Sequence, residues 1–91
     1  MLSLMKTSKS QHSIREVFGN NLRLARRLKD MSQEELALRS ELSRTYVSEV
    51  ERGIRNVSID NMEVLAIAIG VPLSDLVNPE MFSMIKARLA S

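Results

Sequence analysis

The stretch from Gln33 to Arg52, QEELALRSELSRTYVSEVER, decides the fold of this chain. Its pattern predicts two short helices joined by a turn of three to four residues. At 100° per residue, an arc of roughly 140° on the second helix is entirely polar. It holds Arg44, Thr45, Ser48, Glu49 and Arg52, whereas Tyr46, Val47 and Val50 occupy the opposite arc. We therefore expect a helix that packs on a core from behind and shows side chains able to bond base edges or phosphates.

Helix signals also precede this stretch. Apolar residues recur at helical spacing from about Ile14 to Lys29, which predicts a first helix with its arginines on the outer side. Ser32 and Glu35 have the spacing of a capping box, in which each side chain bonds the other residue's backbone amide. The second helix should therefore begin at Gln33.

The following residues carry matching start and stop signals. Ser43 is suited to cap the third helix, and Gly53 stands where a left-handed residue would end it. Ser58 is suited to cap a fourth helix, which Gly70 should end and Pro72 should keep from resuming. This fourth helix is apolar nearly all round, so we expect it to be buried at the centre of the domain.

The remaining residues favour helix as well. Residues 74–77 predict a single turn, and Pro79 suits the first turn of a last helix that runs to about Leu89. No strand-like alternation of useful length occurs. The sequence therefore predicts an all-α fold, a bundle of five or six short helices. Residues 1–13 are expected to form a flexible tail, 14–78 the domain, and 79–91 a C-terminal helix.

Composition limits what this chain can be. Its 91 residues allow one small domain, and the lack of cysteine rules out disulfides and thiolate metal sites. Apolar runs are too short to span a bilayer or to form a signal peptide, so a cytoplasmic location is expected. The net charge is +2, but residues 1–30 carry +5 and residues 31–91 carry −3. This asymmetry is a weak indication of a polyanionic partner.

The residues that set this pattern also resemble a known family. The segments FGNNLRLAR, SQEELA, LSRTYVSEVERG and NVSIDNMEVLAIAIGV are similar, in order and spacing, to the Xre or Cro/cI-like helix-turn-helix regulators. The resemblance covers about Phe18 to Leu76. The segment RTYVSEVERGIRNVS also resembles the controller proteins of restriction–modification systems. The resemblance implies a lambda-repressor-like domain that binds double-stranded DNA and regulates transcription, with residues 43–52 in the major groove.

This resemblance assigns roles to particular residues. Gln33 would bond a phosphate, and Arg44 would contact guanine in bidentate fashion. Along the third helix, Thr45 and Ser48 would meet base edges or a thymine methyl, and Glu49 would accept from cytosine. The remaining contacts, to backbone or base, are assigned to Tyr46, Arg52, Arg55 and Asn56. Without the surrounding motif, a polar face of this kind would be interpreted as solvated, as we interpret Arg23 and Arg27.

Two structural features are also implied by the family. The glutamate at the position of Glu51 pairs with an arginine of the first helix, which here is Arg26. A partly buried pair of this kind orients helices more than it stabilises them. Glu41 stands where the family usually has glycine, and a side chain with positive φ costs roughly 1 kcal/mol there.

An apolar stripe near the C-terminus is a candidate dimer contact. It comprises Met81, Phe82, Ile85 and Leu89, which recur at helical spacing. Symmetric operators in the family imply dimers, and such a stripe could lie on a two-fold axis. The alternative is that these residues only close the core of the monomer over the fourth helix.

Catalysis is not expected from this sequence. Its only histidine lies in the tail, and it contains neither a glycine-rich phosphate loop nor a metal-binding spacing. No cofactor, metal or small-molecule effector is therefore expected. The competing function is a protein-interaction module such as an antitoxin. An antitoxin typically needs an additional segment that wraps the toxin, and the residues outside the expected helices offer little for that.

Overall fold

The computed structural model describes residues 13–81, 83 and 84 of the chain. These residues form helices and loops, and no strand occurs among them, so the prediction of an all-α fold is confirmed. The helices are α2 (Ile14–Leu28), α3 (Gln33–Ser40), α4 (Arg44–Glu51), α5 (Ile59–Ile69) and α6 (Leu73–Leu76). Residues 81, 83 and 84 are also helical. The rest of the expected last helix lies outside the described residues.

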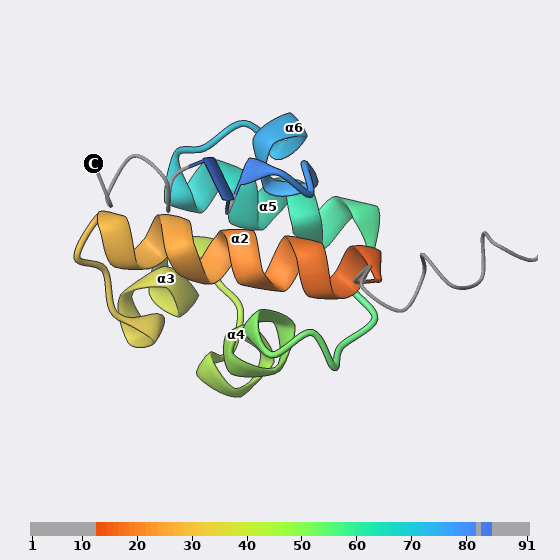
Figure 1. Cartoon of the computed structure of the whole chain (residues 1–91). Helices are drawn as coiled ribbons and strands as arrows, with labels where there is room; N and C mark the ends of the chain where they lie inside the picture. Colours follow the sequence, from red (N-terminus) through yellow and green to blue (C-terminus); the bar gives the residue numbers. More distant parts are fainter. Residues whose placement is uncertain (1–12, 82, 85–91) are drawn as a thin grey trace, which may run out of the picture.

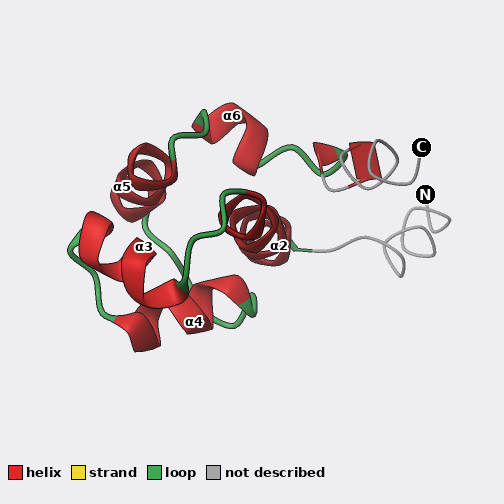
Figure 2. Ribbon diagram, turned by 90° about the vertical axis from the view of Figure 1, so that its left-hand side faces the viewer, coloured by secondary structure: helices red, strands yellow, loops and turns green. Residues whose placement is uncertain are grey.

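Helix α2 lies in the middle of the molecule. Figure 1 shows it running between α5 and α6 on one side and α3 and α4 on the other, and Figure 2 shows α2 and α5 nearly end-on. Contacts of α2 with α4, α5 and α6, and of α3 with α4 and α5, close the bundle. The core takes side chains from all five helices, among them Phe18, Leu22, Leu36, Val47, Val50, Leu65, Ile69 and Leu76.

Four serines cap the longer helices, because each side-chain oxygen accepts from a backbone amide three residues later. They are Ser13, Ser32, Ser43 and Ser58. Only Ser13, which we assigned to the tail, forms the reciprocal capping box, with Glu16. The capping box expected at Ser32 is half formed, since the carboxylate of Glu35 accepts from Arg39 at 2.6 Å instead.

Helix α5 corrects the expectation that it is buried on all sides. Leu65, Ala66 and Ile69 face the core, but Ile59 is 76% and Ile67 74% exposed. The helix lies at the edge of the bundle, where α3, α2 and α6 cover only one of its faces (Figure 2). The apolar sequence of α5 predicted burial on all sides, but this small bundle has too few helices to cover more than one of its faces.

The turn between α3 and α4 has the left-handed residue that the family resemblance implied. Glu41 has φ 60° and ψ 31°, and it forms the C-cap of α3. Gly53 and Gly70 also have positive φ, as expected of residues that end a helix. At Glu41 the chain accepts a strain of roughly 1–2 kcal/mol that glycine would avoid.

Asn21 ties the C-terminal part of the domain to α2. This buried side chain donates through Nδ2 to the carbonyls of Leu76 and Asn78, each at 2.9 Å, and to that of Asp75 at 3.4 Å. These carbonyls lie at and beyond the end of α6, where helical partners run out. One amide thus fixes the position of α6 against α2.

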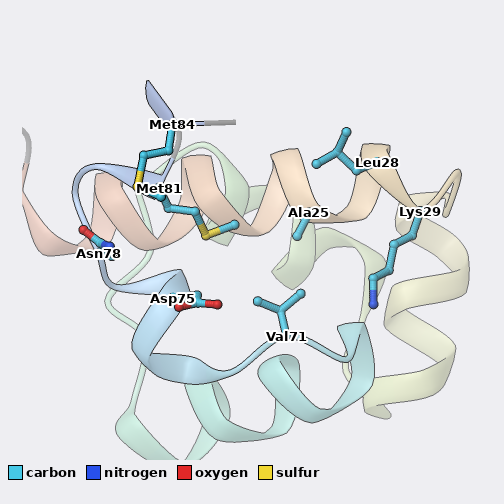
Figure 3. Close-up of a pocket in the computed structure, with 8 residues that line it drawn as sticks. All are labelled: Ala25, Leu28, Lys29, Val71, Asp75, Asn78, Met81 and Met84. Carbon is cyan, nitrogen blue, oxygen red and sulfur yellow. The ribbon is translucent and has the colours of Figure 1, made fainter. Parts of the chain in front are cut away.

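An open, largely apolar hollow of about 340 Å³ lies between α2 and the residues after α5. Figure 3 shows Ala25, Leu28 and Val71 around it, with Met81 and Met84 at one end. Met81 is 8% exposed and belongs to the core, which agrees with the core-closing alternative, while its role as a dimer contact stays a prediction. Phe82, Ile85 and Leu89 lie outside the described residues, so their dimer role stays a prediction.

Within the described part of the chain, no helix combines the length and apolar character needed to cross a membrane.

Candidate nucleic-acid interface

Helix α4 has the two faces that its sequence indicates. Val47 and Val50 are buried, at 0% and 1% exposure. On the other side the predicted base-reading residues share one surface, with Arg44, Thr45 and Arg52 exposed and Ser48 and Glu49 half-buried. The helix is short, and Ser43 caps its first turn. Its polar side chains are therefore presented by a helix whose back is fixed in the core.

A buried ion pair fixes the C-terminal end of α4 against α2. The guanidinium of Arg26 donates to the carboxylate of Glu51 through Nε at 2.6 Å and Nη2 at 3.0 Å. Its Nη1 donates to the carbonyl of Met31 at 2.8 Å. Arg26 and Glu51 are 9% and 3% exposed, so solvent hardly screens the pair. The structure brings together the two residues that the family resemblance pairs.

Gln33 belongs to the same network. Its Nε2 donates to Oε1 of Glu51 at 3.0 Å, so in the free protein this side chain serves the ion pair. We expected Gln33 to bond a phosphate. Its position at the start of α3, where backbone amides have no helical acceptor, is compatible with that role. The network therefore connects the start of α3, the end of α4 and the central helix α2.

A second network lies at the other side of α4. Arg55 donates to the carboxylate of Glu49 at 2.7 Å, and its guanidinium carbon lies 4.7 Å from the centre of the Tyr46 ring. The hydroxyl of Tyr46 accepts from Nδ2 of Asn61 at 3.0 Å. These contacts hold Arg55 beside the polar face of α4. They also occupy part of the Glu49 carboxylate, which keeps further acceptor sites for a base.

Asn61 is the member of this network that the sequence did not single out. It lies on α5 and is separated from Tyr46 by 15 positions. Its own surroundings, at the start of an apolar helix after Ser58, indicate only a helix N-terminus. Asn56, a predicted phosphate contact, is exposed in the loop between α4 and α5.

Comparison with known proteins agrees with this geometry. Residues 22–76 match the family model described as Helix-turn-helix. The chain belongs to the helix-turn-helix family. Within the family it is 48% identical over 68 residues to the control protein C.BamHI of Bacillus amyloliquefaciens, which covers 74% of this chain and 84% of that protein.

Two solved helix-turn-helix structures are informative. The restriction–modification controller protein C.AhdI from Aeromonas hydrophila is 47% identical, with a TM-score of 0.66 over 68% of this chain and 94% of that one. The controller protein C.Esp1396I, solved as a tetramer in complex with its natural 35 base-pair operator, is 28% identical. Its TM-score is 0.70 over 79% of this chain and 99% of that one. The fold and the family resemblance are thus confirmed.

Proposed function

We propose that this protein is a sequence-specific, double-stranded DNA-binding regulator of transcription that places α4 in the major groove. The observation that carries the proposal is the two-faced α4, buried along Val47 and Val50 and locked to α2 through Glu51. A helix that reads bases needs its opposite face held firmly in the core, because a bidentate contact with a base tolerates little movement. We further propose that it is the controller protein of a restriction–modification system, as its relatives are named.

The exposed side chains of α4 supply the chemistry for reading bases. Arg44 stands in the first turn and is exposed, so its planar guanidinium is free to pair with guanine O6 and N7. Thr45 and Ser48 offer hydroxyls to base edges, and Glu49 offers acceptor sites to cytosine N4. Arg52 stands at the end of the helix, within reach of base or backbone.

Residues outside α4 position the domain on the DNA backbone. In this proposal the start of α3 at Gln33 and the loop residues Arg55 and Asn56 bond phosphates. The phenol of Tyr46 can still donate its proton to a phosphate while it accepts from Asn61. The Glu49 carboxylate would otherwise repel the backbone, and its contact with Arg55 lessens that repulsion.

A catalytic role is not supported by this site. The carboxylates of Glu49 and Glu51 are each engaged by an arginine, and the protein's relatives are named as control proteins and regulators. We propose that the protein is not an enzyme, uses no cofactor and acts in the cytoplasm, associated with the nucleoid. A protein-interaction module such as an antitoxin remains the competing function, and the following experiment distinguishes the two.

Arg44→Ala should weaken binding to the specific site by about 1–3 kcal/mol, or roughly 5- to 150-fold, and relax specificity at one base pair. Arg55→Ala, as the contrasting variant, should weaken binding evenly across sequences and flatten the dependence on salt. Selection from a random duplex pool gives the site, and fluorescence anisotropy measures both variants on it. An Arg44→Ala protein that binds DNA as well as the wild type would favour the protein-interaction module.

We also propose that the protein acts as a homodimer. Its target should then be a pseudo-palindrome with half-sites about one duplex turn apart, roughly 34 Å. The C-terminal residues Phe82, Ile85 and Leu89 are one candidate contact. The exposed apolar side chains of α5, Ile59 and Ile67, add a second surface that association could cover. Sedimentation equilibrium at micromolar concentration tests this, and a purely monomeric mass with and without DNA would contradict it.

A further inference from the structure

A basic hollow of about 250 Å³ lies beside the reading helix, between α2, α4 and the start of α3. Its lining comes from three helices that follow one another in the sequence. The residues are Arg23, Arg26 and Arg27 of α2, Gln33 of α3, Ser48 and Glu51 of α4, and Arg52 at the C-cap of α4. We call this surface the arginine hollow. It contains four arginines and one acid, so its net charge is +3.

The charges of the arginine hollow are unequally satisfied. Glu51 is fully engaged by Arg26 and Gln33, so it neutralises the buried arginine. By contrast, Arg23, Arg27 and Arg52 are exposed. Across residues 13–81, 83 and 84, the guanidinium groups of these three arginines form no hydrogen bond or ion pair. Three unpaired cations around one hollow repel one another, and an anion there would relieve that repulsion.

The hollow also offers neutral donors. Ser48 lines it and carries a hydroxyl group. Gln33 also lines it and begins α3, so the free backbone amides of the first turn of α3 lie close to the hollow and favour a negative charge there. Two of its members, Ser48 and Arg52, lie on the proposed reading face of α4. The hollow is therefore continuous with that face, on the side toward α2. A duplex seated on α4 would bring its sugar–phosphate backbone, which carries a charge at every nucleotide, close to this surface.

We propose that the arginine hollow binds a phosphate of the DNA backbone and that Arg23 and Arg27 are positioning residues for DNA binding. This inference rests on the proposed function. The arginine fork matches phosphate in bidentate fashion, and contacts of this kind fix register without reading sequence. The two arginines thus extend the DNA footprint from α3 and α4 onto α2, and they are more than a solvated helix face.

The test compares Arg23→Gln, Arg27→Gln and the double variant with the wild type. Lys29→Gln is the matched control, because it removes one positive charge from the C-terminal end of α2. The ammonium of Lys29 donates to the carbonyl of Gly70 at 3.3 Å, on the α5 side (Figure 3). Affinity is measured between 50 and 200 mM salt, on the selected site and on a scrambled duplex, together with the thermal unfolding midpoint.

We expect the double variant to lose affinity for both duplexes equally, on the order of tenfold at low salt. The slope of log K against log salt should become shallower by about one to two, near 0.9 for each lost phosphate contact. Lys29→Gln should bind with the wild-type slope, and all variants should unfold at the wild-type temperature within a few degrees.

A double variant with the wild-type slope, or one that loses affinity only for the selected site, would overturn the assignment. A slope change as large for Lys29→Gln would overturn it as well, because general charge would then explain the effect. If the wild-type protein retains no duplex at all, the proposed function fails first. If the wild type binds DNA and the double variant binds it identically, this inference is wrong but the proposed function still stands.

Discussion

Glu51→Ala should lower the free energy of unfolding by about 3–5 kcal/mol. The substitution leaves Arg26, a residue that is 9% exposed, without the carboxylate that accepts two of its guanidinium hydrogen bonds. It also removes the acceptor of Gln33. An uncompensated buried charge is among the few changes that cost this much in a small domain. Urea denaturation, followed by circular dichroism, measures the loss.

Glu49→Ala is the matched control for Glu51→Ala. It removes the same side chain from the same helix and breaks an ion pair of similar length, 2.7 Å against 2.6 Å. Because Arg55 is 48% and Glu49 28% exposed, this pair should contribute no more than about 1 kcal/mol. Equal losses in the two variants would show that burial of the Arg26–Glu51 pair adds nothing. The double variant Arg26→Met with Glu51→Leu should recover part of the stability.

Gly19→Ala should destabilise the protein by at least about 1–3 kcal/mol, although alanine in a helix normally stabilises by about 1 kcal/mol over glycine. A Cβ at position 19 would lie 2.2 Å from the carbonyl oxygen of Val50 and 3.0 Å from that of Glu51. Both are backbone atoms at the end of α4, so no side-chain rotation relieves the overlap. Helices α2 and α4 would have to move apart.

Two measurements separate this packing effect from helix propensity. Asn20→Ala, at the neighbouring exposed position of α2, should change stability by no more than about 0.5 kcal/mol. Gly19→Ala should also weaken specific DNA binding, because the displaced α4 carries the proposed reading face. A Gly19→Ala protein as stable as the wild type would mean that the close approach of α2 to α4 is not required.

Much of the helical framework follows from local signals in the sequence. Ser32, Ser43 and Ser58 cap their helices, and Gly53 and Gly70 take the left-handed conformation that ends them. These signals are readable because each acts within a few residues of itself. The polar and apolar faces of α4 follow from the helical period for the same reason. The pairing of Arg26 with Glu51 was implied by the resemblance to a family and not by any local pattern.

Tertiary structure decided the features that join distant parts of the chain. Which face of α5 is buried depends on how many neighbours reach it, so the apolar Ile59 and Ile67 are exposed. Asn21 binds carbonyls 54 to 57 positions away, and Gly19 admits a carbonyl of α4. No periodicity encodes such contacts. The gathering of Arg23, Arg27 and Arg52 around one hollow arises in the same way, since only packing of α2 on α4 brings charges from separate helices to one surface.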